Sequence, residues 1–207
     1  DMDGQAQTLI NRSAALLNSG RPAAAAADLE SAAPLITDAP RLEPALARSR
    51  GILATRAGDL ETAERFLLDA LAAVTELAET APALDQAATQ FAMGKLRLEQ
   101  KQPQLARQHF TTALNLDRLT GHSHGLADDL EALGDCAHSA ADWPLAAAYY
   151  KRSVRISALM DHTEKTRQLL EKLQALVTAH PETIAANLTL FFIDRWVDGE
   201  QEANICP

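Results

Sequence analysis

Two histidines in the stretch GHSHG, His122 and His124, have the type and spacing that come nearest to a metal site. A His-x-His pair chelates a metal when a third and a fourth ligand lie within reach. No cluster of cysteine or histidine lies nearby in the sequence, and the pair falls in an expected loop between helices. We therefore expect a polar loop here, with no metal and no other cofactor.

Cys136 and His138 would form a thiol–imidazole pair if their side chains met. Both fall in an expected helix, where residues two apart point to different sides, so a catalytic pair is not expected. Acidic residues follow the same helix, and their simplest interpretation is a solvated or partner-facing stripe: Asp128, Asp129, Glu131 and Asp135. The sequence has no phosphate loop, dinucleotide-binding glycine pattern or nucleophile motif, and we expect no enzyme.

Charge and composition narrow the choice of partners. The 207 residues carry a formal net charge of −9, and 47% are hydrophobic but only 4% aromatic. An acidic chain without a basic run lacks the lysines and arginines that displace counterions from phosphates, which argues against nucleic acid. No apolar stretch reaches the roughly 18 residues of a membrane span. Burial must rest on alanine and leucine, which favours closely packed helices over a sheet.

The compartment stays open at this stage. The chain begins Asp1-Met2, which fits a trimmed chain, a piece of a longer protein, or a mature chain after signal removal. The cytoplasm is the default expectation, and the periplasm or secretion is the alternative. The two cysteines, Cys136 and Cys206, lie far apart and leave a disulfide undecided.

A pattern of four residues recurs along the chain: a turn residue, a small residue five positions later, a large apolar residue four further on, and a small one after three more. Its turn residues are Gly20, Gly58, Lys101 and Ala141. In the stretch GDLETAERFLLDAL it places Ala63 and Ala70 on either side of Phe66 and Leu67, which together are expected to supply the bulk.

A second small residue lies seven positions before each turn: Ser13, Gly51, Gly94 and Gly134. Glycine inside a helix costs about 1 kcal/mol relative to alanine. Three such glycines at matching places therefore predict a neighbouring helix that passes too close for a Cβ atom.

Prolines and capping residues mark the helix starts. Pro tolerates the first turn of a helix, and six prolines fall where helices are expected to begin: Pro22, Pro40, Pro82, Pro103, Pro144 and Pro181. Capping side chains precede three of them, namely Asp38, Thr80 and Asp142. These signals predict helix hairpins over 5–35, 40–77, 82–117 and 122–160, all within residues 1–160. A degenerate fifth hairpin or capping pair is expected over 161–197, and a polar tail over 198–207.

These helix pairs resemble the tetratricopeptide repeat, in which small residues lie at the helix crossing and an aromatic residue follows in the second helix. The resemblance covers about residues 5–160 and is carried by the small positions with Phe110 and Tyr150. The tryptophan and tyrosine often found in the first helix are absent.

The repeat period is longer than usual. Successive small positions, Ser13, Gly51, Gly94 and Gly134, are 38, 43 and 40 residues apart, against about 34 in the usual repeat. Longer periods predict longer helices or loops, as in the repeats of kinesin light chains and G-protein modulators. The resemblance implies an all-α fold, a right-handed α-solenoid of about four to five antiparallel hairpins.

The resemblance also implies a binding surface on the first helices of the hairpins, which line the concave face. Its residues flank the small crossing position: Arg48, Ile52, Thr55, Arg56, Phe91, Lys95, Leu98, Asp128, Glu131, Asp135 and His138. Basic side chains beside an aromatic ring suit an extended peptide or its carboxylate. We expect a non-catalytic adaptor or scaffold that binds a peptide or protein segment. The alternative is a regulatory or sensor segment of a larger signalling or transcription-regulating protein.

The last expected helix, 182–197, has the heaviest apolar face. Such a face covers the open end of a solenoid or forms an interface. A homodimer through Leu188, Phe191, Phe192 and Trp196 is therefore a further expectation.

Overall fold

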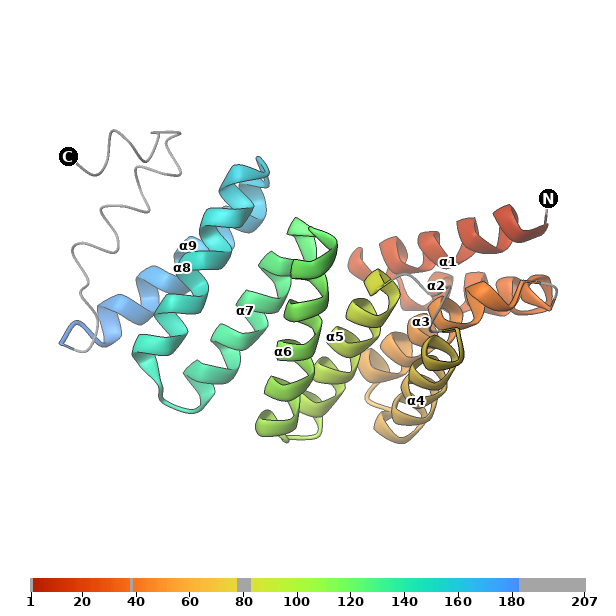
Figure 1. Ribbon diagram of the computed structural model, residues 1–207, viewed down its shortest axis with the longest axis horizontal. Helices are drawn as coiled ribbons and strands as arrows, with labels where there is room; N and C mark the ends of the chain where they lie inside the picture. Colours follow the sequence, from red (N-terminus) through yellow and green to blue (C-terminus); the bar gives the residue numbers. More distant parts are fainter. Residues whose placement is uncertain (1, 38, 78–82, 183–207) are drawn as a thin grey trace. The chain divides into compact units, whose positions relative to one another are not determined.

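The computed structural model describes residues 2–37, 39–77 and 83–182, and these residues form nine α-helices and no β-strand (Figure 1). The α-helices are α1 (Met2–Asn18), α2 (Pro22–Ala32), α3 (Glu43–Ala57), α4 (Leu60–Glu76), α5 (Ala83–Glu99), α6 (Pro103–Thr120), α7 (Ser123–Ser139), α8 (Trp143–Leu159) and α9 (Thr163–Ala179). Two 3-10 helices, η1 (Ala33–Ile36) and η2 (Pro40–Leu42), lie between α2 and α3. The all-α prediction is confirmed.

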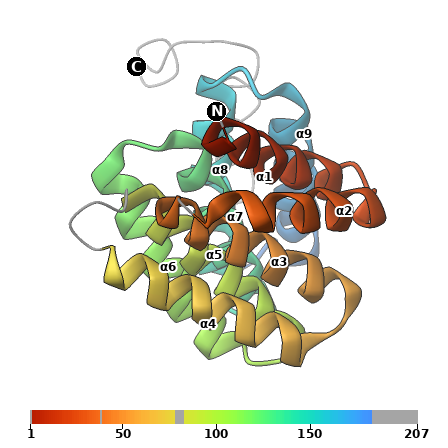
Figure 2. The same cartoon turned by 90° about the vertical axis from the view of Figure 1, so that its right-hand side faces the viewer.

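The chain divides into two compact units, unit 1 (residues 1–116) and unit 2 (residues 117–207). In unit 1, α1 packs against α2, α3 packs against α4, and both α3 and α4 contact α5. In unit 2, α8 packs between α7 and α9. Figure 2 shows α3 and α4 side by side as an antiparallel pair. Adjacent helices in each unit thus pack as in the hairpins of a tetratricopeptide-like solenoid; the predicted repeat boundaries stay a prediction.

The four turn residues of the recurring pattern share one backbone conformation. Gly20, Gly58, Lys101 and Ala141 all have positive φ, between 59° and 79°. At Gly58, its N–H donates to the carbonyl of Thr55, and the next N–H donates to the carbonyl of Ala54. The other three turns repeat this pair of bonds, which satisfies the last carbonyls of the first helix. One sharp left-handed residue therefore reverses the chain in each of these hairpins.

The three matching glycines lie where two helices of a hairpin cross. A Cβ built on Gly51 would lie 2.5 Å from Cγ of Leu67, and one on Gly134 would lie 2.5 Å from the Tyr150 ring. One on Gly94 would overlap the ring of Phe110. The predicted steric need is confirmed, because the large residue of the second helix fills the space of the missing Cβ in each hairpin.

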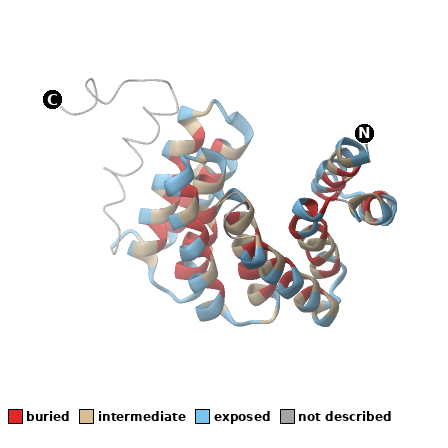
Figure 3. Cartoon of the chain, turned by 45° about the vertical axis from the view of Figure 1, so that its right-hand side comes forward, coloured by how far each residue is buried: buried red, intermediate tan, exposed pale blue. Residues whose placement is uncertain are grey.

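The small residues of the second helices form the core of each crossing. They have no exposed surface: Ala25, Ala32, Ala63, Ala70, Ala106, Ala113, Ala146 and Ser153. Buried residues line the sides on which helices meet, and exposed residues face outward (Figure 3). In α4 only Leu67 supplies the bulk, because it is fully buried whereas Phe66 is half-buried. The expectation that both residues share this role was wrong for Phe66.

From α3 onward, long helices contribute to the long repeat period, whereas the first period contains the short α2 and two 3-10 helices. From α3 to α9 the helices have 15 to 18 residues, longer than the average of about 10 to 14. Asp142 caps α8 by accepting from the N–H of Leu145, as predicted. Pro40 begins the 3-10 helix η2 rather than α3, which starts at Glu43. No helix within the described ranges is both long and apolar enough to cross a membrane.

Several sequence predictions fall outside the described residues. They concern the caps Asp38 and Thr80, the apolar residues Leu188, Phe191, Phe192 and Trp196, and Cys206. Cys136 is buried in α7, and His138 is exposed near the end of the same helix.

Gly94→Ala tests the crossing. The added methyl overlaps the fully buried Phe110 ring, and such overpacking costs about 1–3 kcal/mol, only partly offset by about 1 kcal/mol of helix propensity. We expect a lower free energy of unfolding in urea. Gly4→Ala, at an exposed position of α1, is the control and should not destabilise the protein. A stabilised Gly94→Ala variant would contradict the close crossing.

Ala141→Gly tests the left-handed turn. Alanine is strained at positive φ, so glycine should raise the free energy of unfolding by up to about 1 kcal/mol. The matched control is Ala148→Gly, at an exposed interior position of α8, which should cost about 1 kcal/mol. Equal losses in the two variants would show that residue 141 is not left-handed in solution.

Candidate functional site

The eleven predicted contact residues lie on three helices. Seven are in unit 1, on α3 and α5, and four are in unit 2, on α7. Helices α3 and α5 contact each other. The predicted residues therefore form two separate sets, one in each unit. The two sets differ in how many of their charged side chains form ion pairs or hydrogen bonds within the chain.

Arg48 connects two first helices of unit 1. Its Nη1 lies 3.0 Å from Oδ1 of Asp85 at the start of α5 and 3.4 Å from the Asp85 carbonyl oxygen. The Arg48 side chain is only 16% exposed. This ion pair fastens α3 to α5, so Arg48 has a structural partner within the chain.

Arg56 is also engaged within the chain. Its guanidinium donates to the carbonyl of Leu17 and, at 3.0 Å, to Oδ1 of Asn18. Both acceptors are in the last turn of α1, where the helix dipole favours a cation. Arg56 therefore links α3 to the C-terminal end of α1.

Lys95 differs from the two arginines. It is exposed on α5, and its Nζ lies 5.3 Å from the centroid of the Phe91 ring and 5.9 Å from that of Phe110. The two rings are 5.4 Å apart. Lys95 forms no ion pair with any residue that the structure describes. It is thus a cation held over aromatic rings and accessible to an anion from outside.

The remaining predicted residues of unit 1 are half-buried. Ile52 and Leu98 present part of an apolar side chain, and Ile52 packs against the core between α3, α4 and α5. The hydroxyl of Thr55 donates to the carbonyl of Gly51, one turn back in its own helix. Apolar surface therefore lies on the same two helices as Lys95.

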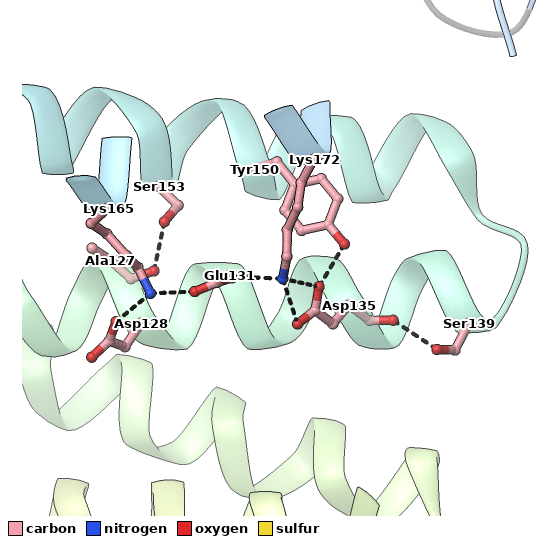
Figure 4. Close-up of polar contacts among 9 residues, drawn as sticks. All are labelled: Ala127, Asp128, Glu131, Asp135, Ser139, Tyr150, Ser153, Lys165 and Lys172. Carbon is pink, nitrogen blue, oxygen red and sulfur yellow. Dashed lines mark hydrogen bonds and ion pairs between the residues drawn. The ribbon is translucent and has the colours of Figure 1, made fainter. Parts of the chain in front are cut away.

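In unit 2, two lysines of α9 neutralise the acidic stripe of α7 (Figure 4). Lys165 contacts Glu131 and lies 2.9 Å from Oδ1 of Asp128. Lys172 lies 2.7 Å from Oε1 of Glu131 and 2.9 Å from Oδ1 of Asp135. These ion pairs attach α9 to α7.

Tyr150 of α8 completes this network. Its hydroxyl donates to Oδ1 of Asp135 at 2.7 Å, and Lys172 Nζ lies 5.7 Å from its ring centroid. Burial, followed by the bond to Asp135, raises the pKa of Tyr150. Burial alone would raise the pKa of Glu131, but hydrogen bonds from Lys165 and Lys172 outweigh it and lower the pKa. The ionised network therefore holds α7, α8 and α9 together.

Sequence reasoning missed the two lysines. Asp128, Glu131 and Asp135 are spaced by three and four residues, and Lys165 and Lys172 by seven, so each set occupies one helix face. The matching spacing was the available signal. The pairing also required the knowledge that α9 lies within reach of α7.

Asp129 is not part of the acidic stripe. It is 1% exposed, and burial, followed by the charge of Asp117, raises its pKa to about 8. The solvated interpretation was wrong for this residue, because a step of one position along a helix turns the side chain by about 100°, here into the core. Asp117 is also buried and lies 3.2 Å from Nδ1 of His122.

The histidines near this carboxyl pair contact each other by their rings. The centroids of His124 and His162 are 4.4 Å apart, and those of His122 and His124 are 6.2 Å apart. Within the described ranges, no group of three or more His, Cys, Asp or Glu residues is arranged to hold a metal ion.

His138, the last predicted contact residue, packs edge-on against Trp143, with the two ring centroids 5.2 Å apart.

Asp129 should make the stability of the protein depend on pH. A carboxyl group of the unfolded chain titrates near pH 4, so between about pH 4 and 8 the folded state binds more protons. The free energy of unfolding should therefore fall as pH rises through this window. Asp129→Asn should reduce the slope and stabilise the protein at pH 8 by at least about 1 kcal/mol.

The control for this prediction is Asp69→Asn, which makes the same chemical change at an exposed position. Urea unfolding at several pH values compares the two variants with the parent, so that titration of the histidines is common to all three. A slope that is unchanged in Asp129→Asn would exclude a protonated Asp129.

Comparison with known proteins shows which family and which solved structure the chain resembles. Residues 85–158 match the tetratricopeptide repeat family. No curated protein matches the chain. Among solved structures, BtubC (BKLC) from P. vanneervenii is similar in fold, with 16% identity and a TM-score of 0.68 over 98% of this chain and 76% of that chain. Tetratricopeptide repeats are in general non-catalytic modules of protein–protein interaction. With its helix hairpins, its small-residue crossings and this match over residues 85–158, the chain has a tetratricopeptide-repeat-like fold.

Proposed function

We propose that the protein is an adaptor that binds an extended peptide or protein segment on the α3–α5 face of unit 1. This face consists of Arg48, Ile52, Thr55, Arg56, Phe91, Lys95 and Leu98. The observation that carries this proposal is that Lys95 is exposed and unpaired with any described anion. Among the three basic residues of this face, Arg48 and Arg56 bond to groups of the chain itself, whereas Lys95 is exposed and has no anionic partner among the described residues.

The surroundings of Lys95 fit a peptide ligand. The aromatic ring of Phe91 lies under the ammonium group, and Ile52 and Leu98 add half-buried apolar surface on the same helices. A cation beside apolar surface suits a carboxylate followed by an apolar side chain, because the carboxylate gains a charge-assisted hydrogen bond. Main-chain carboxylates and acidic side chains of an extended peptide both offer this chemistry.

The acidic residues of α7 have a structural role in this proposal. Asp128, Glu131 and Asp135 are matched by Lys165 and Lys172, so a basic partner would have to displace two lysines that hold α9. We therefore assign these acids to the stability of unit 2 and Lys95 to the contact with the partner. His138 is exposed and stays a predicted contact.

Lys95→Glu tests the proposal. Peptides that bind are selected from a library with free C-terminal carboxylates, and their Kd is measured by fluorescence anisotropy. Reversing the charge should weaken binding by about tenfold or more without loss of helicity in circular dichroism. Arg107→Glu, at an exposed position of α6, is the control of equal charge change.

Arg48 is not a suitable position for a binding test. Reversal of Arg48 breaks the ion pair with Asp85 and so confounds binding with stability. Equal binding by Lys95→Glu and the parent would refute the assigned site, and so would equal losses in Lys95→Glu and Arg107→Glu.

A further inference from the structure

The second helix of the first hairpin is shorter than its counterparts. Helix α2 has 11 residues and α4 has 17. Pro34 follows directly, and the chain continues as the 3-10 helix η1 instead of completing the last turns of α2. The 3-10 helix η1 therefore lies where the second helix of a longer hairpin would continue.

A groove of about 380 Å³ lies at this place, between η1, α3 and α4 of unit 1. We call it the η1–α4 groove and define it by its apolar floor, Ile36, Leu46 and Phe66, and its acidic rim, Glu43, Asp69 and Glu76. Its volume falls in the range of roughly 300–1,000 Å³ that is usual for ligand sites. None of its residues belongs to the α3–α5 face proposed above.

Phe66 is half-buried because its ring forms part of the groove floor. Leu67, its neighbour, fills the space beside Gly51, so Phe66 is left to face the groove. The guanidinium groups of Arg50 and Arg65 lie 5.7 Å and 5.3 Å from the centroid of its ring. The ring is thus already in contact with cationic side chains, which aromatic faces attract.

The rim has a strong excess of negative charge. Glu43, Asp69 and Glu76 are exposed, and none of them forms an ion pair with a described residue. Among the described residues, Arg50 is the one cation that lines the groove. Arg65 also approaches the Phe66 ring, so three carboxylates stand against at most two guanidinium groups. Carboxylates around an apolar floor attract a ligand that is cationic at its edges and apolar at its centre.

We propose that the η1–α4 groove binds a basic amphipathic helix of a partner protein. An apolar side chain of that helix packs against Phe66 and Leu46, and lysines or arginines flanking it pair with Glu43, Asp69 and Glu76. This is the helix-in-groove mode of recognition.

Charge distinguishes this occupant from the alternatives. A second copy of the chain carries a net charge of −9 and would be repelled by the acidic rim. The segment 183–207 of the same chain contains four acidic residues and one arginine, so it also lacks the required charge. A basic segment from another protein is the occupant that the groove complements.

The experiment compares two triple variants with the same change in net charge. The first removes the rim charges (Glu43→Gln, Asp69→Asn and Glu76→Gln), and the second removes exposed charges elsewhere in unit 1 (Glu30→Gln, Glu61→Gln and Glu99→Gln). The probe is a labelled helical peptide of leucine and lysine, with a leucine–glutamate peptide as its counterpart. Binding is measured by fluorescence anisotropy at two salt concentrations.

The rim variant should bind the leucine–lysine peptide about tenfold more weakly than the parent, and the second variant within about threefold. Ala72→Trp is a further variant that leaves the charge unchanged and fills the groove from an exposed position of α4. It should also weaken binding, and Lys95→Glu should not.

Three results would overturn the proposal. Equal losses in both triple variants would mean attraction to the overall negative charge, and full binding by Ala72→Trp would place the peptide elsewhere. Self-association of the parent that the rim variant abolishes, measured by analytical ultracentrifugation, would identify a second copy as the occupant. Because Lys95 lies outside the groove, failure here leaves the test of the α3–α5 face unaffected.

Discussion

The close crossing of the two helices in a hairpin is the constraint on which this structure depends. At Gly51, Gly94 and Gly134 the large residue of the second helix occupies the volume of a side chain that is missing from the first. Alanines without exposed surface flank these contacts. The backbones can therefore approach closely, and a chain with few aromatic residues still buries enough surface, because small residues let many atoms meet at short range.

The same constraint explains the turns. Two helices that cross this closely must be joined by a sharp reversal, and one left-handed residue followed by a new helix start provides it. Glycine serves at residues 20 and 58, but Lys101 and Ala141 adopt the same conformation at some cost in free energy. Packing of the two helices outweighs the local preference of these residues, which is why a turn position could be recognised from its spacing even without glycine.

Charged residues of the first helices have mainly structural partners. Arg48 and Arg56 link α3 to its neighbours in unit 1, and Lys165 and Lys172 hold α9 on α7 in unit 2. The contacts of Arg48 and Lys165 are partly buried, and Lys172 bonds to two carboxylates, which distinguishes them from isolated exposed pairs that contribute little. Lys95 and the carboxylates of the η1–α4 rim are, by contrast, exposed and form no ion pair with a described residue.

The sequence by itself determined the all-α class, the recurring hairpin and the need for glycine at the crossings, because these follow from local spacing and from the volume of single residues. It also placed Lys95, Arg48 and the α7 acids on first helices. Only the tertiary structure decided which of those charges are neutralised, that Asp129 is buried, and that Phe66 lines a groove beside η1. These properties depend on which residues distant in sequence lie within a few ångströms, and helical periodicity carries no information about that distance.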